Sequence, residues 1–305
     1  MTARVVCIGI ATLDAIALVD RLPDAGDRMP AREARLAGGG VAATAAVTLA
    51  RLGIPVAFVG RVGDDEPGRM VVDGLAREGV DTKGLRVVRG RTPVTIVLIE
   101  AASGERTLVP DTRGVPPIEL NGEDVASCSG AEWIHVDQTG HPAIAVLRGA
   151  GIGTAVSFDG GNVDRQFELA QVDLYAPTEG ALLARYPGRP LQEALEAALA
   201  EGPGLLVVTR GAHGSAAAKR VADGSRAEVL TAPAEPSLVM STLGAGDVFH
   251  GAFLAAMVEG RSLPDALRWA NAAAALSCRA IDGRGAIPDR AELEAFLSEP
   301  REVAS

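Results

Sequence analysis

Short apolar runs alternate along the chain with longer stretches in which apolar and small residues recur at helical spacing. Helical patterns include residues 41–52, which end at Gly53, and a helix that opens at Asp65 and closes at Gly79. Continuous apolar strands separated by helices indicate a mainly parallel sheet covered on both faces. The sequence therefore predicts a doubly wound α/β fold. The predicted strands are residues 5–10, 55–60, 133–137, 154–159, 172–176 and 205–209.

Two segments break this alternation. Residues 15–36 carry an alternating pattern after Asp14, and residues 92–110 hold two β-rich runs around Ser103 and Gly104. The second segment predicts a β-hairpin. Together the two segments predict a small sheet that stands off the main one as a lid. The sequence contains no linker, repeat or charge run, so we expect one domain over residues 1–305 with a β excursion.

Composition and charge narrow the classes of function. The chain has 305 residues, 36 of them glycine, and a formal net charge of −10, which argues against nucleic acid or an anionic membrane as the main partner. Its three cysteines lie far apart, which argues against a disulfide framework. The N-terminal apolar run is too short to span a membrane, and no cleavage pattern follows it. We expect a cytoplasmic protein.

The strongest local motif lies in the last quarter of the chain. Gly244, Ala245 and Gly246 form a turn of small residues, and an apolar helix follows to about Glu259. A helix N-terminus offers unpaired N–H groups and a positive dipole end, and small residues let an anion approach them. Asp247 in the first helical turn suits proton acceptance. The alternative is a glycine-rich turn with an aspartate that only caps the helix.

A second glycine cluster precedes the first predicted helix. Gly38, Gly39 and Gly40 allow close backbone contact with a polar ligand, or form a plain entry loop. The first strand is not followed by GxGxxG, so dinucleotide binding is disfavoured. The sequence also lacks a Walker A lysine and a nucleophile elbow. The four histidines lack metal-ligand spacing, and we interpret them as structural.

These motifs give the chain a resemblance to the ribokinase-like (PfkB) carbohydrate kinases along nearly its whole length. The segment from Gly9 to Asp14 looks like the family's sugar-binding Asp segment. The most specific match is the run Thr242-Leu243-Gly244-Ala245-Gly246-Asp247, which resembles the C-terminal signature. The other matching segments are residues 39–53 and 60–68, which resemble the N-terminal signature, and residues 271–275 and 285–288, which resemble the last helix and final loop.

The resemblance implies a set of site residues. Asp14, Gly39 and Gly40 would bind sugar hydroxyls. Asp247 would be the catalytic base, and the N–H groups of residues 244–246 would stabilise the transferring phosphoryl group. The remaining implied residues are Thr209, Gly211, Gly214 and Asn271 at the nucleotide, and Glu179 at Mg²⁺.

Three positions depart from the family pattern. Thr44 replaces the usual Asn at the substrate, and Ser241 replaces the usual Asp that opens the C-terminal signature, which leaves activation by K⁺ open. Only Glu179 survives of the Asn-x-x-Glu magnesium motif.

The implied reaction is ATP-dependent phosphorylation of a primary sugar hydroxyl, with ATP and Mg²⁺ bound and two lids pairing in a homodimer. The glycine cluster and the run after Gly246 look closest to the sulfofructose and ketohexose kinase branch. Arg28, Arg32 and Arg113 are candidates to grip an anionic substrate group, or are solvated surface arginines. The alternatives are a ribokinase, a nucleoside kinase of the adenosine type, or a catalytically silent sugar-binding protein.

Overall fold

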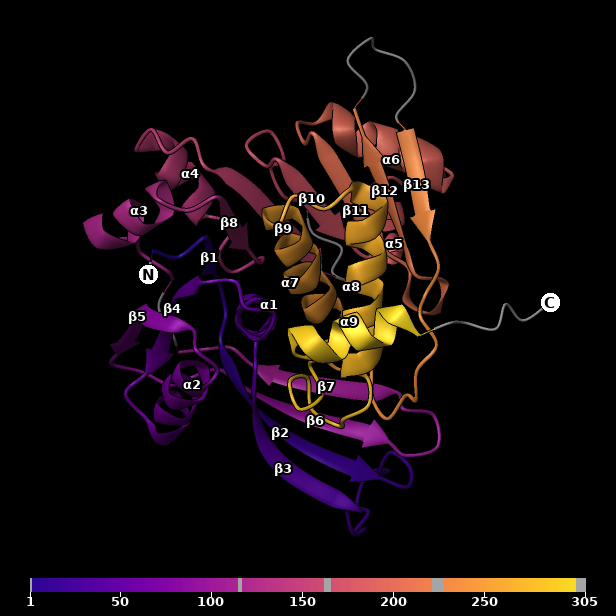
Figure 1. Ribbon diagram of the computed structural model, residues 1–305. Coiled ribbons are helices and arrows are strands. Elements are labelled where there is room, and N and C mark those ends of the chain that lie inside the picture. Colours follow the sequence, from indigo (N-terminus) through magenta and orange to yellow (C-terminus); the bar gives the residue numbers. More distant parts are fainter. Residues whose placement is uncertain (1, 115–116, 162–165, 221–227, 300–305) are drawn as a thin grey trace, which may run out of the picture.

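The computed structural model describes residues 2–114, 117–161, 166–220 and 228–299, which form a large sheet and a small one (Figure 1). The large sheet has nine strands. Its strands from β11 through β10, β9, β8, β1 and β4 to β5 pair in parallel, while β12 and β13 extend one edge antiparallel. In spatial order the strands are β13 (Glu228–Ala232), β12 (Ser215–Lys219), β11 (Leu205–Thr209), β10 (Leu174–Pro177), β9 (Ala155–Gly161), β8 (Trp133–Val136), β1 (Val5–Ile8), β4 (Val56–Gly63) and β5 (Asp81–Val88).

Helices cover both faces of the large sheet, so the predicted α/β class is confirmed. Successive side chains of β1 enter opposite cores, because strand residues alternate between the two faces. Val5 and Cys7 pack with α1, α2, α7, α8 and α9, whereas Val6 and Ile8 pack with the helices of the other face. The helices are α1 (Val41–Arg51), α2 (Glu66–Arg77), α3 (Gly122–Ser129), α4 (Ala143–Gly149), α5 (Glu179–Arg185), α6 (Leu191–Ala200), the short 3-10 turn η1 (Gly211–His213), α7 (Ala245–Val258), α8 (Leu263–Ser277) and α9 (Arg290–Ser298).

Two of the predicted helices show the local chemistry that sets their ends. The Asp65 side chain accepts the N–H of Gly68 and caps α2. Gly53, just beyond α1, has a φ of 80°, a conformation that favours glycine. No helix in the described part of the chain combines the length and the apolar composition needed to cross a bilayer.

The small sheet is the predicted lid. Figure 1 shows it standing off one end of the large sheet. Its β6–β7 pair is the predicted hairpin, while β2 pairs parallel with β6 and antiparallel with β3. One face of the lid, through Ile16, Val97 and Ile99, packs on Leu243 and Ile281 of the main body. The lid strands in spatial order are β3 (Glu33–Gly39), β2 (Thr12–Val19), β6 (Val94–Glu100) and β7 (Arg106–Asp111).

Candidate active site

Residues 38–40, where β3 ends and the chain turns into α1, are here called the Gly38 turn and are packed against a buried carboxylate. Asp14 on β2 is 7% exposed, and its Oδ1 accepts the Thr12 hydroxyl at 2.8 Å. A Cβ on Gly39 would lie 2.1 Å from Asp14 Oδ2, and a Cβ on Gly40 would lie 2.4 Å from the Ile10 carbonyl oxygen. The glycines are therefore required so that the turn can approach Asp14.

A buried arginine joins this turn to the other end of the chain. Arg284 lies in the loop of residues 282–285, after α8, and is 7% exposed. Its Nη2 donates to the Gly39 carbonyl at 2.6 Å and its Nε to the Thr44 hydroxyl at 3.2 Å. Burial lowers the pKa of Arg284 to about 10, although the charges of Asp14 and Asp247 oppose this shift. The guanidinium remains a cation at neutral pH and compensates both carboxylates.

The turn of residues 244–246, here called the Gly244 turn, starts α7. Gly244 has a φ of 73° and abuts Gly283, since a Cβ there would come within 3.0 Å of the Gly283 Cα. The 282–285 loop thus contacts both glycine turns. The Ala245 N–H donates to the Thr242 carbonyl at 3.3 Å, so one of the three implied donors already has a protein partner. A Cβ on Gly246 would meet no atom within 4 Å, so space is open beside that residue.

Asp247 lies in the first turn of α7, between positive and negative groups. Burial raises its pKa well above the usual value, and the charges of Asp159 and Asp137 add to the effect. Arg106 and Arg284 act in the opposite direction. A carboxylate whose pKa is raised toward neutral pH is a stronger proton acceptor than an ordinary one. The environment of Asp247 is therefore suited to general-base chemistry.

The implied nucleotide residues gather at the end of β11 and at the end of β13, two strands away in the sheet. Gly214, with a φ of 79°, leaves no room for a Cβ, which would lie 2.1 Å from the Ala232 carbonyl oxygen. Asn271 on α8 donates to the carbonyls of Ala232 at 3.2 Å and Pro233 at 2.9 Å. Gly214 and Asn271 thus meet at the same backbone segment. Thr209 ends β11, and Gly211 follows it with a φ of 55°.

The implied metal ligand Glu179 is the first residue of α5, which Thr178 caps. Its carboxylate accepts Arg210 Nε at 3.3 Å, and its side chain is 28% exposed. It belongs to no cluster of three metal-ligating side chains in the described residues. A single, solvent-accessible carboxylate fits a Mg²⁺ ion that keeps most of its water and is held mainly by phosphate oxygens.

Three charged residues near these turns were not predicted from the sequence. Arg284 is one. Arg106 on β7 of the lid hydrogen-bonds the Thr242 hydroxyl, two residues before Gly244. Asp137, at the end of β8, accepts the N–H groups of Ile10 and Ala42 and so orients the start of α1. Burial raises the Asp137 pKa to about 6. The glycines on both sides of Arg284 were a usable signal, because they permit a buried arginine in a tight loop.

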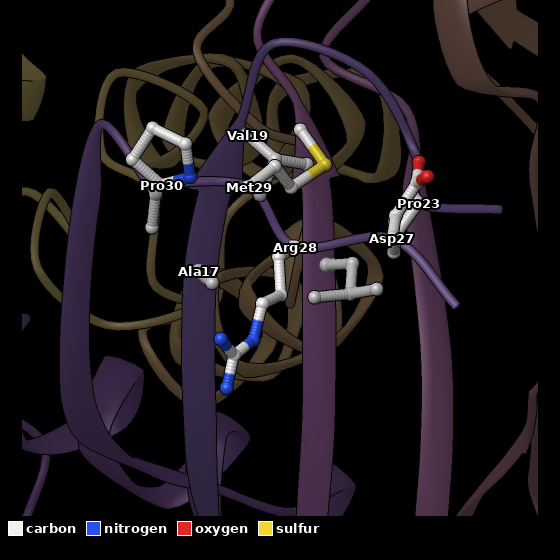
Figure 2. Close-up of a pocket in the computed structure, with 9 residues that line it drawn as sticks. Ala17, Val19, Pro23, Asp27, Arg28, Met29 and Pro30 are labelled. Carbon is white, nitrogen blue, oxygen red and sulfur yellow. The ribbon is translucent and has the colours of Figure 1, made fainter. Parts of the chain in front are cut away.

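The three candidate arginines for an anionic substrate group lie elsewhere. Arg32 pairs with Asp20, and Arg113 pairs with Asp111, both at exposed positions. Arg28 lines a pocket of about 640 Å³ with Ala17, Val19 and Leu98. Figure 2 shows Arg28, Ala17 and Val19 among the lining side chains. Because these strand neighbours alternate with Ile16, Val97 and Ile99, this pocket lies on the lid face that points away from the main body. All three arginines fit the solvated-surface alternative.

The comparisons with known proteins agree with this geometry. The model of the "pfkB family carbohydrate kinase" matches residues 2–140 and 168–290. A ribokinase of Bacillus subtilis is 29% identical over 97% of this chain and 100% of its own length. A fructokinase of Klebsiella pneumoniae is 31% identical over 82% of this chain and 85% of its own. Arabidopsis thaliana ribokinase, solved with ribose and ATP, superposes with a TM-score of 0.85 at 26% identity, covering 98% of this chain and 100% of that one.

The structure joins an open glycine turn beside the half-buried Asp247 to a filled glycine turn beside the buried Asp14, with the small sheet next to both. The chain belongs to the pfkB family of carbohydrate kinases and has the ribokinase-like fold. It is a carbohydrate kinase, a phosphotransferase with an alcohol acceptor.

Proposed function

We propose that this kinase transfers the γ-phosphoryl group of ATP to a primary hydroxyl of a ketohexose or a derivative such as fructose or sulfofructose. The observation that carries the proposal is the position of Asp247 beside the Gly244 turn, joined through Arg284 to Asp14 and the Gly38 turn. Asp14 and Gly39 would accept and donate hydrogen bonds to the sugar. Asp247 would face the hydroxyl that reacts.

Phosphoryl transfer requires alignment and charge neutralisation more than covalent help. The acceptor oxygen bonds to the γ-phosphorus while the bond to the ADP oxygen breaks. The proton of the acceptor hydroxyl passes to Asp247 Oδ. The N-terminus of α7 and the open space at Gly246 would accommodate the charged phosphoryl oxygens. Arg106, which reaches Thr242 from the lid, adds a positive charge at the same place.

Glu179 would help to hold Mg²⁺, and Thr209, Gly211, Gly214 and Asn271 would form the nucleotide side. When bound, Mg²⁺ neutralises phosphate charge. A role for K⁺ also stays a prediction. The Ser241 hydroxyl already accepts the Leu243 N–H at 3.1 Å, so we expect only a weak response to K⁺.

The lid favours a sugar over a nucleoside as acceptor. Residues 15–36 and 93–109 contain no Phe, Tyr or Trp on which a base could stack. Asp14 and its neighbour Thr12 instead present oxygens. A panel of ketohexoses, aldoses, sulfosugars and nucleosides, coupled to ADP release, identifies the acceptor. The highest kcat/KM on a nucleoside would favour the nucleoside kinase, and the highest on ribose would favour the ribokinase.

Asp247→Asn tests the catalytic role. The variant keeps the shape of the side chain but cannot accept the proton, so we expect normal folding and a kcat lower by roughly 10³-fold. Sugar-dependent thermal stabilisation should remain within about threefold in Kd. Turnover retained with only sugar affinity lost would contradict the role of Asp247. Sugar binding by the wild type with no ATP turnover on any acceptor would favour the silent sugar-binding protein.

We also propose a homodimer formed through the lids. Leu36, Ile96 and Val109 lie on the outer lid face at 56%, 52% and 57% exposure, in register with one another across Ala15. An apolar row of this kind is typical of an interface. Light scattering should give twice the chain mass for the wild type and one chain mass for Ile96→Asp. Lys83→Asp, at an exposed residue of the large sheet, is the control. A monomeric wild type would contradict the lid dimer.

A further inference from the structure

Three buried titratable side chains beneath the first turns of α7 have no part in the proposed reaction. His135 on β8 is fully buried, Asp159 on β9 is 2% exposed and His250 on α7 is 6% exposed. His250 follows Asp247 by three residues, so the two side chains leave neighbouring turns of one helix face. The cluster therefore lies about one helical turn beyond the residue proposed as the base.

A short hydrogen bond connects the helix to the sheet at this cluster. His250 Nδ1 and Asp159 Oδ2 are 2.5 Å apart, and Asp159 Oδ1 accepts the Gly161 N–H at 2.7 Å. His135 Nδ1 contacts the Ser157 hydroxyl at 3.2 Å, and its ring lies 6.2 Å from that of His250. This hydrogen bond therefore ties α7 to β9 inside a buried polar cluster.

The same three side chains could ligate a metal ion. Two ligands on one Zn²⁺, each about 2.0–2.2 Å from the ion in tetrahedral geometry, lie more than about 3 Å apart. The 2.5 Å separation of His250 Nδ1 and Asp159 Oδ2 is instead that of two atoms that share a proton. The geometry therefore favours a hydrogen bond between these two side chains over a metal site.

Charged groups around the His250–Asp159 pair shift the pKa of Asp247. Burial lowers the pKa of His135 to about 4, so His135 is neutral at pH 7. Burial is the largest single effect on Asp159 and would raise its pKa, but His250, His135 and the Gly161 N–H together lower it. The Asp159 carboxylate disfavours the ionised form of Asp247, as does Asp137, which directly follows β8. Arg106 from the lid and Arg284 from the 282–285 loop favour the ionised form.

We propose that His250 and Asp159 act together as positioning residues for the base: their hydrogen bond fixes the first turns of α7 on β9, and the Asp159 charge strengthens Asp247 as a proton acceptor. This inference rests on the proposed role of Asp247. Removing Asp159 takes a negative charge away from the surroundings of Asp247. Removing His250 breaks the hydrogen bond between α7 and β9 but leaves the Asp159 carboxylate in place.

The test is the pH profile of kcat/KM for Asp159→Asn and His250→Asn, each of which keeps a hydrogen-bonding group at the contact. Asp159→Asn removes a negative charge, so the acid limb should move to lower pH by about one unit. His250→Asn leaves the Asp159 carboxylate in place but holds α7 on β9 less firmly, so kcat should fall about tenfold without that downward shift of the limb. The double variant should show the limb of Asp159→Asn and the lower kcat of His250→Asn. Titration of ATP itself affects all variants equally and cancels in the comparison. Asp173→Asn is the matched control: this aspartate is exposed, so its loss should leave the limb in place.

A purely structural pair would lower the plateau rate in both variants and leave the limb of Asp159→Asn in place, and this result overturns the proposal. One equivalent of bound metal per chain in the purified wild type also overturns it. A strongly downfield exchangeable proton in the NMR spectrum of the wild type, absent from His250→Asn, gives a readout independent of activity and of the folding of Asp159→Asn. If Asp247→Asn retains turnover, the proposed function fails instead, so the two failures are distinguishable.

Discussion

The two glycine turns look alike in the sequence and differ in what the missing side chains make room for. In the Gly38 turn, the space of the absent Cβ atoms is taken by the protein's own groups, Asp14 Oδ2 and Arg284 Nη1, at 2.1 and 2.4 Å. In the Gly244 turn, the space beside Gly246 is empty for at least 4 Å. The first turn is therefore pre-filled by charged side chains, and the second is open to a ligand. Glycine in the first turn makes room for the protein's own side chains, and Gly246 in the second turn leaves room for a ligand.

Arg284 contributes most to this difference between the two turns, because it fills the space beside Gly38 and donates to the Gly39 carbonyl. Arg284→Met would leave Asp14 buried without its nearest positive charge and would free the Gly39 carbonyl. Breaking a buried network on one side costs about 3–5 kcal/mol, so we expect a loss of about 3 kcal/mol in the free energy of unfolding and about 100-fold in sugar KM. Chemical denaturation and steady-state kinetics measure both. Arg113→Met, at an exposed ion pair, should change stability by less than about 0.5 kcal/mol. Equal effects of the two changes would mean that Arg284 does not organise the site.

Alanine at one glycine of each turn separates the two kinds of turn. Gly39→Ala would overlap Asp14, so we expect a loss of about 2 kcal/mol in stability together with weaker sugar binding. Gly246→Ala meets no atom and adds a better helix former to α7, so stability should hold or rise by up to about 1 kcal/mol. Its kcat should nevertheless fall about tenfold, because the methyl group narrows the open space. Thermal unfolding and kcat, measured on both variants, show which turn is packed and which is open. A fall in the stability of Gly246→Ala would show that its turn is packed like the other.

The smallest effect concerns the pH dependence of stability. Burial raises the pKa of Asp14 in the folded chain above its unfolded value, although Thr12 and Arg284 oppose this. The folded state then holds more protons than the unfolded state, so this residue's contribution to stability falls as the pH rises above about 4. Asp14→Asn should show a shallower decline in Tm from pH 4 to 7 than the wild type, with sugar KM higher by about 100-fold. An identical decline in both proteins would mean that the Asp14 carboxylate is well solvated.

The fold was largely predictable from the sequence, and its exceptions have a physical cause. The apolar run 205–209 is β11 to the residue, and the pattern of 93–109 is the β6–β7 hairpin. Strands β5, β12 and β13 were not predicted. Residues 216–218 of β12 are all alanine, a good helix former, and they become a strand only because they pair with β11 on one side and β13 on the other.

The site was predicted in part, for a related reason. Asp247 and the glycines carry a local pattern that the structure then places around one site. Arg284, Arg106 and Asp137 act across more than a hundred residues of sequence, for instance from β7 of the lid to Thr242. Isolated arginines and aspartates give no local signal for such contacts. The His250–Asp159 pair belongs to the same class, since 91 residues separate its members.

The most direct test of the central claim is the structure of the kinase with its sugar acceptor and a non-hydrolysable ATP analogue, with one distance measured. The account predicts that an Asp247 carboxylate oxygen lies about 2.6–3.2 Å from a primary hydroxyl of the sugar, with the γ-phosphoryl group beside Gly246. A sugar bound between Asp14 and Gly39 whose nearest hydroxyl is held by another side chain, with Asp247 turned away, would contradict it.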